Sequence, residues 1–174
     1  MVINCFWVSG KFKSKGNGKR LLQQCLKDAG KMDGVVAISS DKKRPFMSDP
    51  KFLKYQGFEI IDEAPPFFKL WGIKTNPEAS FPTIMESAKS GTCSDKKGIT
   101  AYYSNSCPFT DHYTNQLLRD YAKDRKIPLT IHQIKNRKDG HNMPIPWIIN
   151  SVFYKGKLVT LEMKAEKHLD KIIA

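Results

Sequence analysis

Apolar runs alternate with glycine, proline and polar residues along the whole chain, and this pattern predicts short strands and helices in alternation. The first run, Ile3–Val8, predicts a strand. After a glycine-containing turn, Lys19–Ala29 has the amphipathic spacing of a helix, and Val35–Ser39 predicts a second strand. Strand, helix and strand in this order predict a βαβ unit, in which a helix connects two parallel strands.

The first part of the chain continues with one short helix and two more strands. The helix is expected over Asp49–Tyr55, with Ser48 as its candidate cap and Gly57 as its stop. The strands are expected over Phe58–Asp62 and Phe67–Ile73, with two prolines between them. The first part is therefore predicted to be α/β.

Residues 77–97 differ in composition from the segments on either side. They are rich in proline, serine, threonine and glycine, which predicts a crossing linker with one helical turn near 83–88. The pattern divides the chain into a first domain over 1–76, this linker, and a second domain over 98–174.

The second domain has its own order of elements, βαβ followed by ββα. The helix after its first strand is expected to open at Cys107-Pro108, because proline is favoured at the first helical position. The expected elements are a strand at Ile99–Tyr103, a helix from Cys107-Pro108 to Lys126, a strand at Leu129–Ile134, a hairpin of Trp147–Phe153 and Leu158–Met163, and a helix at Ala165–Ile173.

The charge of the chain narrows the classes of partner. The 174 residues carry a net charge of +12, with lysines scattered along the chain and one dense cluster around Gly16 and Gly18. Nucleic-acid-binding proteins concentrate their basic residues on one face or arm. We therefore expect a small anionic ligand and no specific nucleic acid, while weak binding of polyanions at low salt stays open.

The sequence has no pattern typical of a membrane helix, a signal peptide or a metal site. No stretch approaches the roughly 20 apolar residues of a membrane helix. The start has no signal-peptide pattern, so we expect a cytoplasmic protein without membrane contact. The four cysteines form no Cys-x-x-Cys pair and are expected to be free thiols. The histidines are dispersed too, and we predict no metal site.

One stretch carries a candidate binding site. Gly16 and Gly18 follow the first predicted strand and open the first predicted helix. In this order, free backbone N–H groups and the positive helix end face the turn, where they bind phosphate groups. The stretch therefore predicts a pyrophosphate cradle, and the alternative is an ordinary glycine-rich turn with solvated basic residues. Those basic residues are Lys13, Lys15, Lys19 and Arg20.

Two common phosphate-binding motifs do not fit this stretch. A P-loop needs glycine where Lys13 stands and Ser or Thr where Arg20 stands, and the dinucleotide fingerprint needs a third glycine where Leu21 stands. What remains is Lys13-x-x-Gly16-x-Gly18. It resembles Gln/Arg-x-x-Gly-x-Gly/Ala, the coenzyme A signature of the GNAT family of N-acetyltransferases, with lysine as a departure at the first position.

The resemblance implies the coenzyme A-binding half of a GNAT fold and transfer of an acetyl group from acetyl-CoA to an amine of a small molecule or peptide. It implies that the backbone N–H of Val8 polarises the thioester carbonyl. Glu59 or Asp62 is the candidate base, and two solvated carboxylates are the alternative. The residues implied to hold acetyl-CoA are Phe6, Val8, Lys13, Lys15, Gly16, Asn17, Gly18 and Lys19.

One departure from the GNAT pattern concerns the chemistry. In many relatives a tyrosine four residues before the Gly57-Phe58 pair protonates the leaving thiolate, but Leu53 stands at that position here. Tyr55 is two residues further along. On a helix it would point about 200° away from Leu53, so it cannot simply take over the role.

Both domains together resemble the YoaP-like acetyltransferases, in which a small thioredoxin-like domain follows the GNAT domain. That likeness makes Cys107 a candidate reactive thiol, because a helix N-terminus favours the thiolate and Thr110 stands where a resolving cysteine would be. A structural cysteine is the alternative. The resemblance rests on Gly16–Lys19, Gly57–Glu59, Asp62–Pro66, Ser106–Phe109 and Pro144–Trp147.

The GNAT resemblance begins at the strand that binds coenzyme A, so the preceding part of that fold is missing from this chain. We expect an acetyl-CoA-dependent N-acetyltransferase, and whether it is active without that part stays open. The alternative is a non-catalytic coenzyme A-binding or single-thiol thioredoxin-like module. The open edge of an apolar strand is a template for pairing with another chain. Ile3–Val8 therefore predicts a homodimer, unless a loop of the same chain covers the edge.

Overall fold

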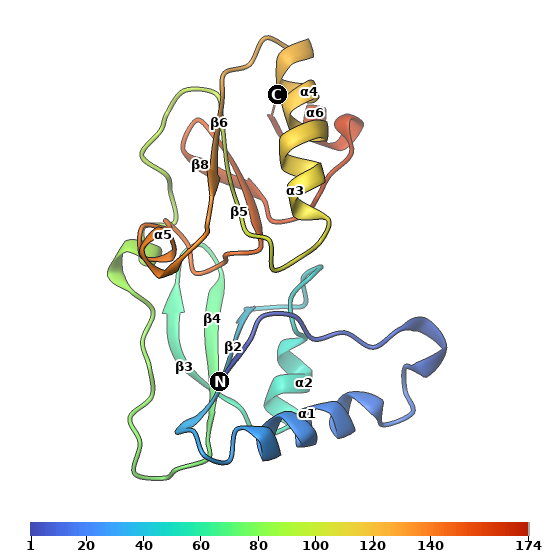
Figure 1. Cartoon of the computed structure of the whole chain (residues 1–174), viewed down its shortest axis with the longest axis vertical. Coiled ribbons are helices and arrows are strands. Elements are labelled where there is room, and N and C mark those ends of the chain that lie inside the picture. The colour runs from blue at the N-terminus through green and yellow to red at the C-terminus, as the bar shows by residue number, and fades with distance from the viewer. Residues whose placement is uncertain (174) are drawn as a thin grey trace. The chain divides into compact units, whose positions relative to one another are not determined.

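A computed structural model describes residues 1–173 and divides the chain into two compact units (Figure 1). The first unit spans Met1–Ile84, and the second begins at Met85. Each unit contains a four-stranded sheet, so the α/β character predicted from the sequence is confirmed for both.

The first unit has a sheet in the order β1-β2-β4-β3. β1 and β2 are parallel and are joined through α1, which confirms the predicted βαβ unit, whereas β4 runs antiparallel to β2 and β3. The elements are β1 (Val2–Ile3), η1 (Gly10–Phe12), α1 (Asn17–Asp28), β2 (Gly34–Ser40), α2 (Pro50–Tyr55), β3 (Glu59–Ala64) and β4 (Phe68–Lys74).

One apolar cluster fixes α1 and α2 on the same face of this sheet. Leu22 of α1 and Leu53 of α2 are almost fully buried against Val35 and Ala37 of β2 and Trp71 of β4. Val35 and Ala37 are two residues apart in a strand and therefore share a face. The packing of both helices positions the start of α1, which carries the glycine turn.

The first strand is much shorter than predicted. Only Val2 and Ile3 pair with β2, and the chain from there to Val8 leaves the sheet, so the prediction of a long apolar strand was wrong. The cause is Phe6, whose ring stacks on Phe52 of α2 with the ring centroids 5.3 Å apart. This aromatic contact draws the chain away from β2 and toward the helices.

The helix α2 has a different cap from the one predicted. The carboxylate of Asp49 accepts a hydrogen bond from the N–H of Lys51 at 2.9 Å, which makes Asp49 the cap. Ser48, the predicted cap, instead accepts at its backbone carbonyl from the hydroxyl of Ser39. Gly57 follows the end of α2 with a φ of 89°, which explains why glycine is needed at this stop.

The segment predicted as a linker is divided between the two units. Ile84 is buried in the first unit, where its N–H donates to the carboxylate of Asp62 at 2.7 Å. In the second unit a short helix, η2 (Glu86–Lys89), is followed by Gly91, whose N–H donates to the carbonyl of Pro144 at 3.0 Å. Each end of the segment is thus held by the unit to which it belongs.

The second unit has a sheet in the order β6-β5-β7-β8. β5 and β6 are parallel, and β7 is antiparallel to β5 and β8, as the predicted βαβ and ββα order requires. The elements are β5 (Ile99–Tyr103), α3 (Thr110–His112), η3 (Tyr113–Leu117), α4 (Leu118–Asp124), β6 (Leu129–Gln133), α5 (Arg137–His141), β7 (Asn150–Tyr154), β8 (Lys157–Thr160) and α6 (Glu166–Ile173).

The helical run from α3 to α4 packs with α6 on this second sheet. Leu118 and Tyr121 on the run and Leu169 on α6 are buried with Ile99 and Val152 of the sheet. α4 and α6 accordingly lie side by side in Figure 1. The run begins at Thr110, two residues after the predicted first helical residue Pro108, because the preceding residues form a turn.

Candidate functional site

The glycine turn leads into α1 with backbone angles that few residues tolerate. Gly16 is the residue before the helix and has a φ of 75°, in the left-handed region that favours glycine. Its carbonyl accepts from the N–H of Arg20 at 3.1 Å, which starts the helix. The side chain of Asn17 donates to the carbonyl of Phe12 at 3.0 Å and holds the loop in place.

The first turn of α1 is open to an anion. No side chain caps it and no acidic residue lies in it, so its backbone N–H groups keep their hydrogen-bonding capacity. Within residues 1–173, none of the basic residues around the turn forms an ion pair with a carboxylate. The positive end of the helix and these charges therefore act together on whatever binds here. The basic residues are Lys13, Lys15, Lys19 and Arg20.

The structure brings Phe6 and Gly18 together. A Cβ atom built on Gly18 would lie 3.7 Å from the ring of Phe6 and 3.6 Å from the ring of Phe52. The segment that carries Phe6 also carries Val8, which is half-buried. In the described part of the chain no hydrogen-bond acceptor lies against the N–H of Val8, so this donor is free for a ligand.

The candidate bases lie on β3, the edge strand on the other side of the sheet from β1. Glu59 is exposed at the start of β3, and β3 lies at the opposite edge of the sheet from β1, with β2 and β4 between them. Three strand spacings amount to about 14 Å. The carboxylate of Asp62 accepts from the N–H groups of Glu63 and Ile84 at 2.8 and 2.7 Å and holds the chain locally. The sequence could not predict this separation, because it depends on strand order.

Leu53, which stands where many GNAT proteins have a tyrosine, is part of the core. Leu53 is 2% exposed and packs with Leu22 and Trp71. Tyr55 is 81% exposed, as its position two residues further along the helix predicts. Neither residue therefore places a proton donor beside the glycine turn.

Replacing Leu53 by tyrosine should destabilise the first unit without creating a proton donor. The larger polar side chain overfills a closed site, and we expect the free energy of unfolding to fall by about 1–3 kcal/mol. Urea denaturation measures this fall, and acetyl transfer should not increase. Tyr55→Phe, at an exposed position on the same helix, is the control and should change neither quantity. A stable Leu53→Tyr variant with faster acetyl transfer would contradict this account.

Cys107 lies in the turn between β5 and the helical run and is partly buried. The hydroxyl of Thr110 does not donate to the thiol of Cys107. The hydroxyl of Thr110 donates to the backbone carbonyls of Ser104 at 2.7 Å and Cys107 at 2.8 Å. Thr110 therefore stabilises the turn, and the expectation that Pro108 is the first helical residue was wrong, because the helix begins at Thr110.

The other cysteines differ in exposure. Cys5 is exposed because its segment leaves the sheet, whereas Cys93 is buried. Burial raises the pKa of the Cys25 thiol, and the nearby Asp28 raises that pKa further. Within residues 1–173 no three His, Cys, Asp or Glu side chains gather in a way that fits a metal ion. None of the helices described is long and apolar enough to cross a membrane.

Comparison with known proteins identifies the family. Residues 128–171 match the family model described as YoaP-like. The chain is 36% identical over 175 residues to the uncharacterized N-acetyltransferase YoaP of Bacillus subtilis (strain 168), and the match covers 99% of this chain and 69% of that protein. The chain belongs to the YoaP-like family. No solved structure matches it.

The two comparisons cover different parts of this YoaP-like chain. The family model covers β6, α5, β7, β8 and most of α6, all of them in the second unit. The glycine turn and α1 lie outside that model, but within the match to the Bacillus N-acetyltransferase. The relation to an acetyltransferase therefore includes the part of the chain that carries the candidate site.

Proposed function

We propose that this chain is an acetyl-CoA-dependent N-acetyltransferase of the GNAT type that transfers the acetyl group to an amine of a small molecule or peptide. The observation that carries the proposal is the glycine turn at α1, with its uncapped helix start and unpaired basic residues. The family relation supports it, because acetyl-CoA is the usual acetyl donor of N-acetyltransferases. An aqueous, cytoplasmic setting stays a prediction.

In this proposal the diphosphate of acetyl-CoA lies at the first turn of α1. Gly16 permits the backbone to turn there, and Asn17 and Gly18 offer their N–H groups to the phosphate oxygens. Lys13, Lys15 and Lys19 neutralise the phosphate charge. Nothing lies within 4 Å of a Cβ built on Gly16, so the space beside the turn is open to a ligand.

The proposed reaction is direct attack by the amine. The amine nitrogen forms a bond to the thioester carbonyl carbon, the carbon–sulfur bond breaks, and coenzyme A leaves as a thiolate. The N–H of Val8 stabilises the negative charge on the carbonyl oxygen. The proton lost by the amine passes to water or to the carboxylate of Glu59, and the thiolate takes its proton from solvent.

The second unit is proposed to be a thioredoxin-like domain. The strand order β6-β5-β7-β8, with β5 and β6 parallel and the two hairpin strands antiparallel, supports this assignment. The thioredoxin fold has a cis-proline just before its third strand, and the resemblance puts Pro144 or Pro146 at that place, but the bonds before both prolines are trans. The assignment therefore rests on topology and on the position of Cys107.

If Cys107 is a reactive thiol, it should alkylate faster than Cys25 and Cys93 at pH 7. Cys93 is buried, and the raised pKa of Cys25 lowers its thiolate fraction. The measurement is iodoacetamide labelling followed by peptide mapping. It uses a Cys5→Ser background, because Cys5 is exposed and reacts through access alone. Faster labelling of Cys25 than of Cys107 would reject the reactive-thiol role.

A non-catalytic coenzyme A-binding module is the alternative, and the burial of Leu53 is the observation that favours it. Calorimetric titration with acetyl-CoA tests binding, which both alternatives require. Release of free coenzyme A in the presence of a panel of amines then separates them. An enzyme releases coenzyme A only when an acceptor is present, whereas a binding module releases none.

We also propose that the chain forms a homodimer through the edge of β1. Only Val2 and Ile3 are available for strand pairing there, and Val2 is exposed. Light scattering over a tenfold range of concentration should give twice the monomer mass of 19.9 kDa. Val2→Pro removes a strand donor at this edge and should restore the monomer. A monomer mass for the unmodified chain at every concentration would end this proposal.

A further inference from the structure

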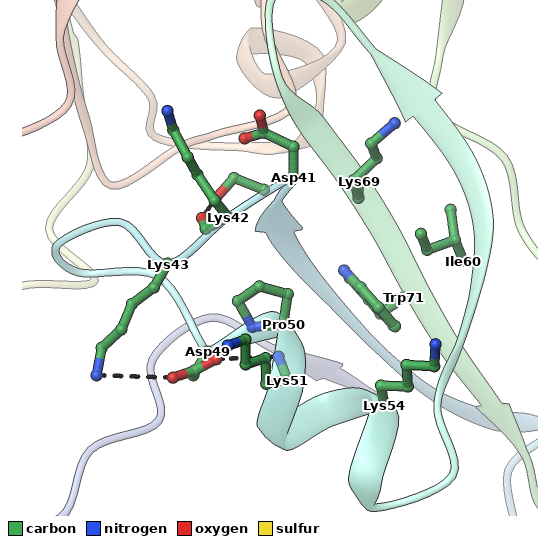
Figure 2. Close-up of a pocket in the computed structure, with 11 residues that line it drawn as sticks. Asp41, Lys42, Lys43, Asp49, Pro50, Lys51, Lys54, Ile60, Lys69 and Trp71 are labelled. Atoms are coloured by element: carbon green, nitrogen blue, oxygen red, sulfur yellow. Dashed lines mark hydrogen bonds and ion pairs between the residues drawn. The ribbon is translucent and has the colours of Figure 1, made fainter.

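A second basic site in the first unit lies apart from the glycine turn. It is a pocket of about 660 Å³ at the end of β2, between α2 and strands β3 and β4 (Figure 2). None of its lining residues is among those proposed to hold acetyl-CoA. No continuous motif marks it in the sequence, because its lysines come from three separate segments. These lysines are Lys42, Lys43, Lys51, Lys54 and Lys69.

A buried donor lines this pocket without a partner. Trp71 is 6% exposed, and its indole N–H has no hydrogen-bond partner. In Figure 2 the indole nitrogen points toward the middle of the ring of pocket residues. A buried donor left unpaired costs about 1–3 kcal/mol, and native proteins leave few of them. An acceptor atom bound in the pocket would pair with it.

The charge around Trp71 favours an anion. The two carboxylates on the wall are already paired, Asp41 with Arg44 at 3.4 Å and Asp49 with Lys43 at 3.6 Å. Three pocket lysines form no ion pair with any of the residues 1–173, so their positive charge is available to a ligand. They are Lys42, Lys51 and Lys54.

The number of unpaired lysines indicates the kind of anion. Lysine binds phosphate as a compact point charge, and three unpaired lysines match the nearly two negative charges of a phosphate monoester better than the single charge of a carboxylate. The pocket also has an apolar wall, formed by Pro50 and by Ile60, a residue that is 46% exposed. Inorganic phosphate would leave this wall bare, but an organic group attached to the phosphate would cover it.

We propose that this pocket binds a phosphate monoester of a small organic molecule. The N–H of Trp71 donates to a phosphate oxygen, and Lys51 and Lys54 of α2 neutralise the phosphate from one side, with Lys42 facing it from the loop after β2. The organic group packs on Ile60. This site is separate from the proposed acetyl-CoA site and does not depend on it.

The test is a titration followed through the indole N–H signals in nitrogen-15 NMR spectra. The three tryptophans give three such signals, and Trp71→Phe assigns the one that matters. Phenyl phosphate should shift the Trp71 signal, while that of Trp147, another buried and unpaired indole N–H, should stay in place. Inorganic phosphate should need a several-fold higher concentration. No shift of the Trp71 signal, or equal affinity for both probes, would overturn the proposal.

Lysine variants keep the test decisive if Trp71→Phe alters the packing. The double variant Lys51→Gln/Lys54→Gln should weaken phenyl phosphate binding by on the order of fivefold, because two charges near the phosphate are lost. Lys31→Gln removes an exposed lysine outside the pocket and should bind normally, as should Gly18→Asp. Equal weakening by Lys31→Gln would mean general charge attraction, and loss with Gly18→Asp would mean binding at the glycine turn. Either result would overturn the proposal.

Discussion

Replacing Gly18 by aspartate should weaken acetyl-CoA binding at least about tenfold, which corresponds to about 1.4 kcal/mol. The new carboxylate would stand in the first turn of α1, where the diphosphate is proposed to bind, and would repel it. A negative charge at a helix N-terminus stabilises the helix itself. A Cβ at this position lies against the rings of Phe6 and Phe52, so urea denaturation of the variant is measured alongside its affinity.

Gly18→Ala is the matched control for this variant. Its Cβ would lie 3.6 Å from the ring of Phe52, which is an ordinary contact, and it adds no charge. We expect calorimetry to give an affinity for Gly18→Ala within about twofold of the wild type, since an uncharged methyl group leaves the phosphate interactions in place. Equal affinities for the aspartate and alanine variants would show that the ligand binds elsewhere.

Gly98→Ala should destabilise the second unit by about 3 kcal/mol. Gly98 has a φ of 67°, and a Cβ at this position would lie 2.2 Å from the carbonyl oxygen of Pro128. That carbonyl accepts from the N–H of Ile99 at 2.8 Å and joins the starts of β5 and β6. The backbone of one of these strands must move to admit the methyl group, and this hydrogen bond is lost.

Gly140→Ala is the control for this stability change. Gly140 lies in α5, and nothing lies within 4 Å of a Cβ built on it, so alanine should be neutral or slightly stabilising. Urea denaturation monitored by circular dichroism gives both free energies of unfolding. Faster amide exchange in β5 of Gly98→Ala would locate the change. Unchanged stability of Gly98→Ala would contradict the described approach of Gly98 to Pro128.

Local sequence signals predicted most elements of the fold. Gly57 marked the end of α2, and the Lys155-Gly156 pair marked the turn between β7 and β8, where both residues have positive φ. Ile99–Tyr103 was predicted to the residue, because its alternation is bounded by a glycine and polar residues. These signals are reliable because each depends on a few neighbouring residues.

The errors arose where distant residues decide the structure. Ile3–Val8 is apolar enough for a strand, but the contact of Phe6 with Phe52 pulls it out of the sheet. The helix α5 was missed because its short run is mainly basic, although Asn136 caps it by accepting from the N–H of Asp139 at 3.1 Å. Tertiary packing and side-chain caps outweigh local propensity in such cases.

The candidate site was predictable only in part. The glycine turn and its basic residues are consecutive in sequence, so one motif located them. Glu59 lies near Gly57 in sequence, but the strand order puts its strand, β3, at the opposite edge of the sheet from β1. The pocket around Trp71 joins residues from β2, α2, β3 and β4 and leaves no continuous motif to find.

The most direct test of the proposed function is a crystal structure of this chain with acetyl-CoA. We predict that the diphosphate contacts the N–H groups of the first turn of α1, and that the thioester carbonyl accepts a hydrogen bond from the N–H of Val8. Acetyl-CoA bound with its diphosphate away from Gly16 and Gly18, for example in the lysine pocket around Trp71, would contradict the proposed function.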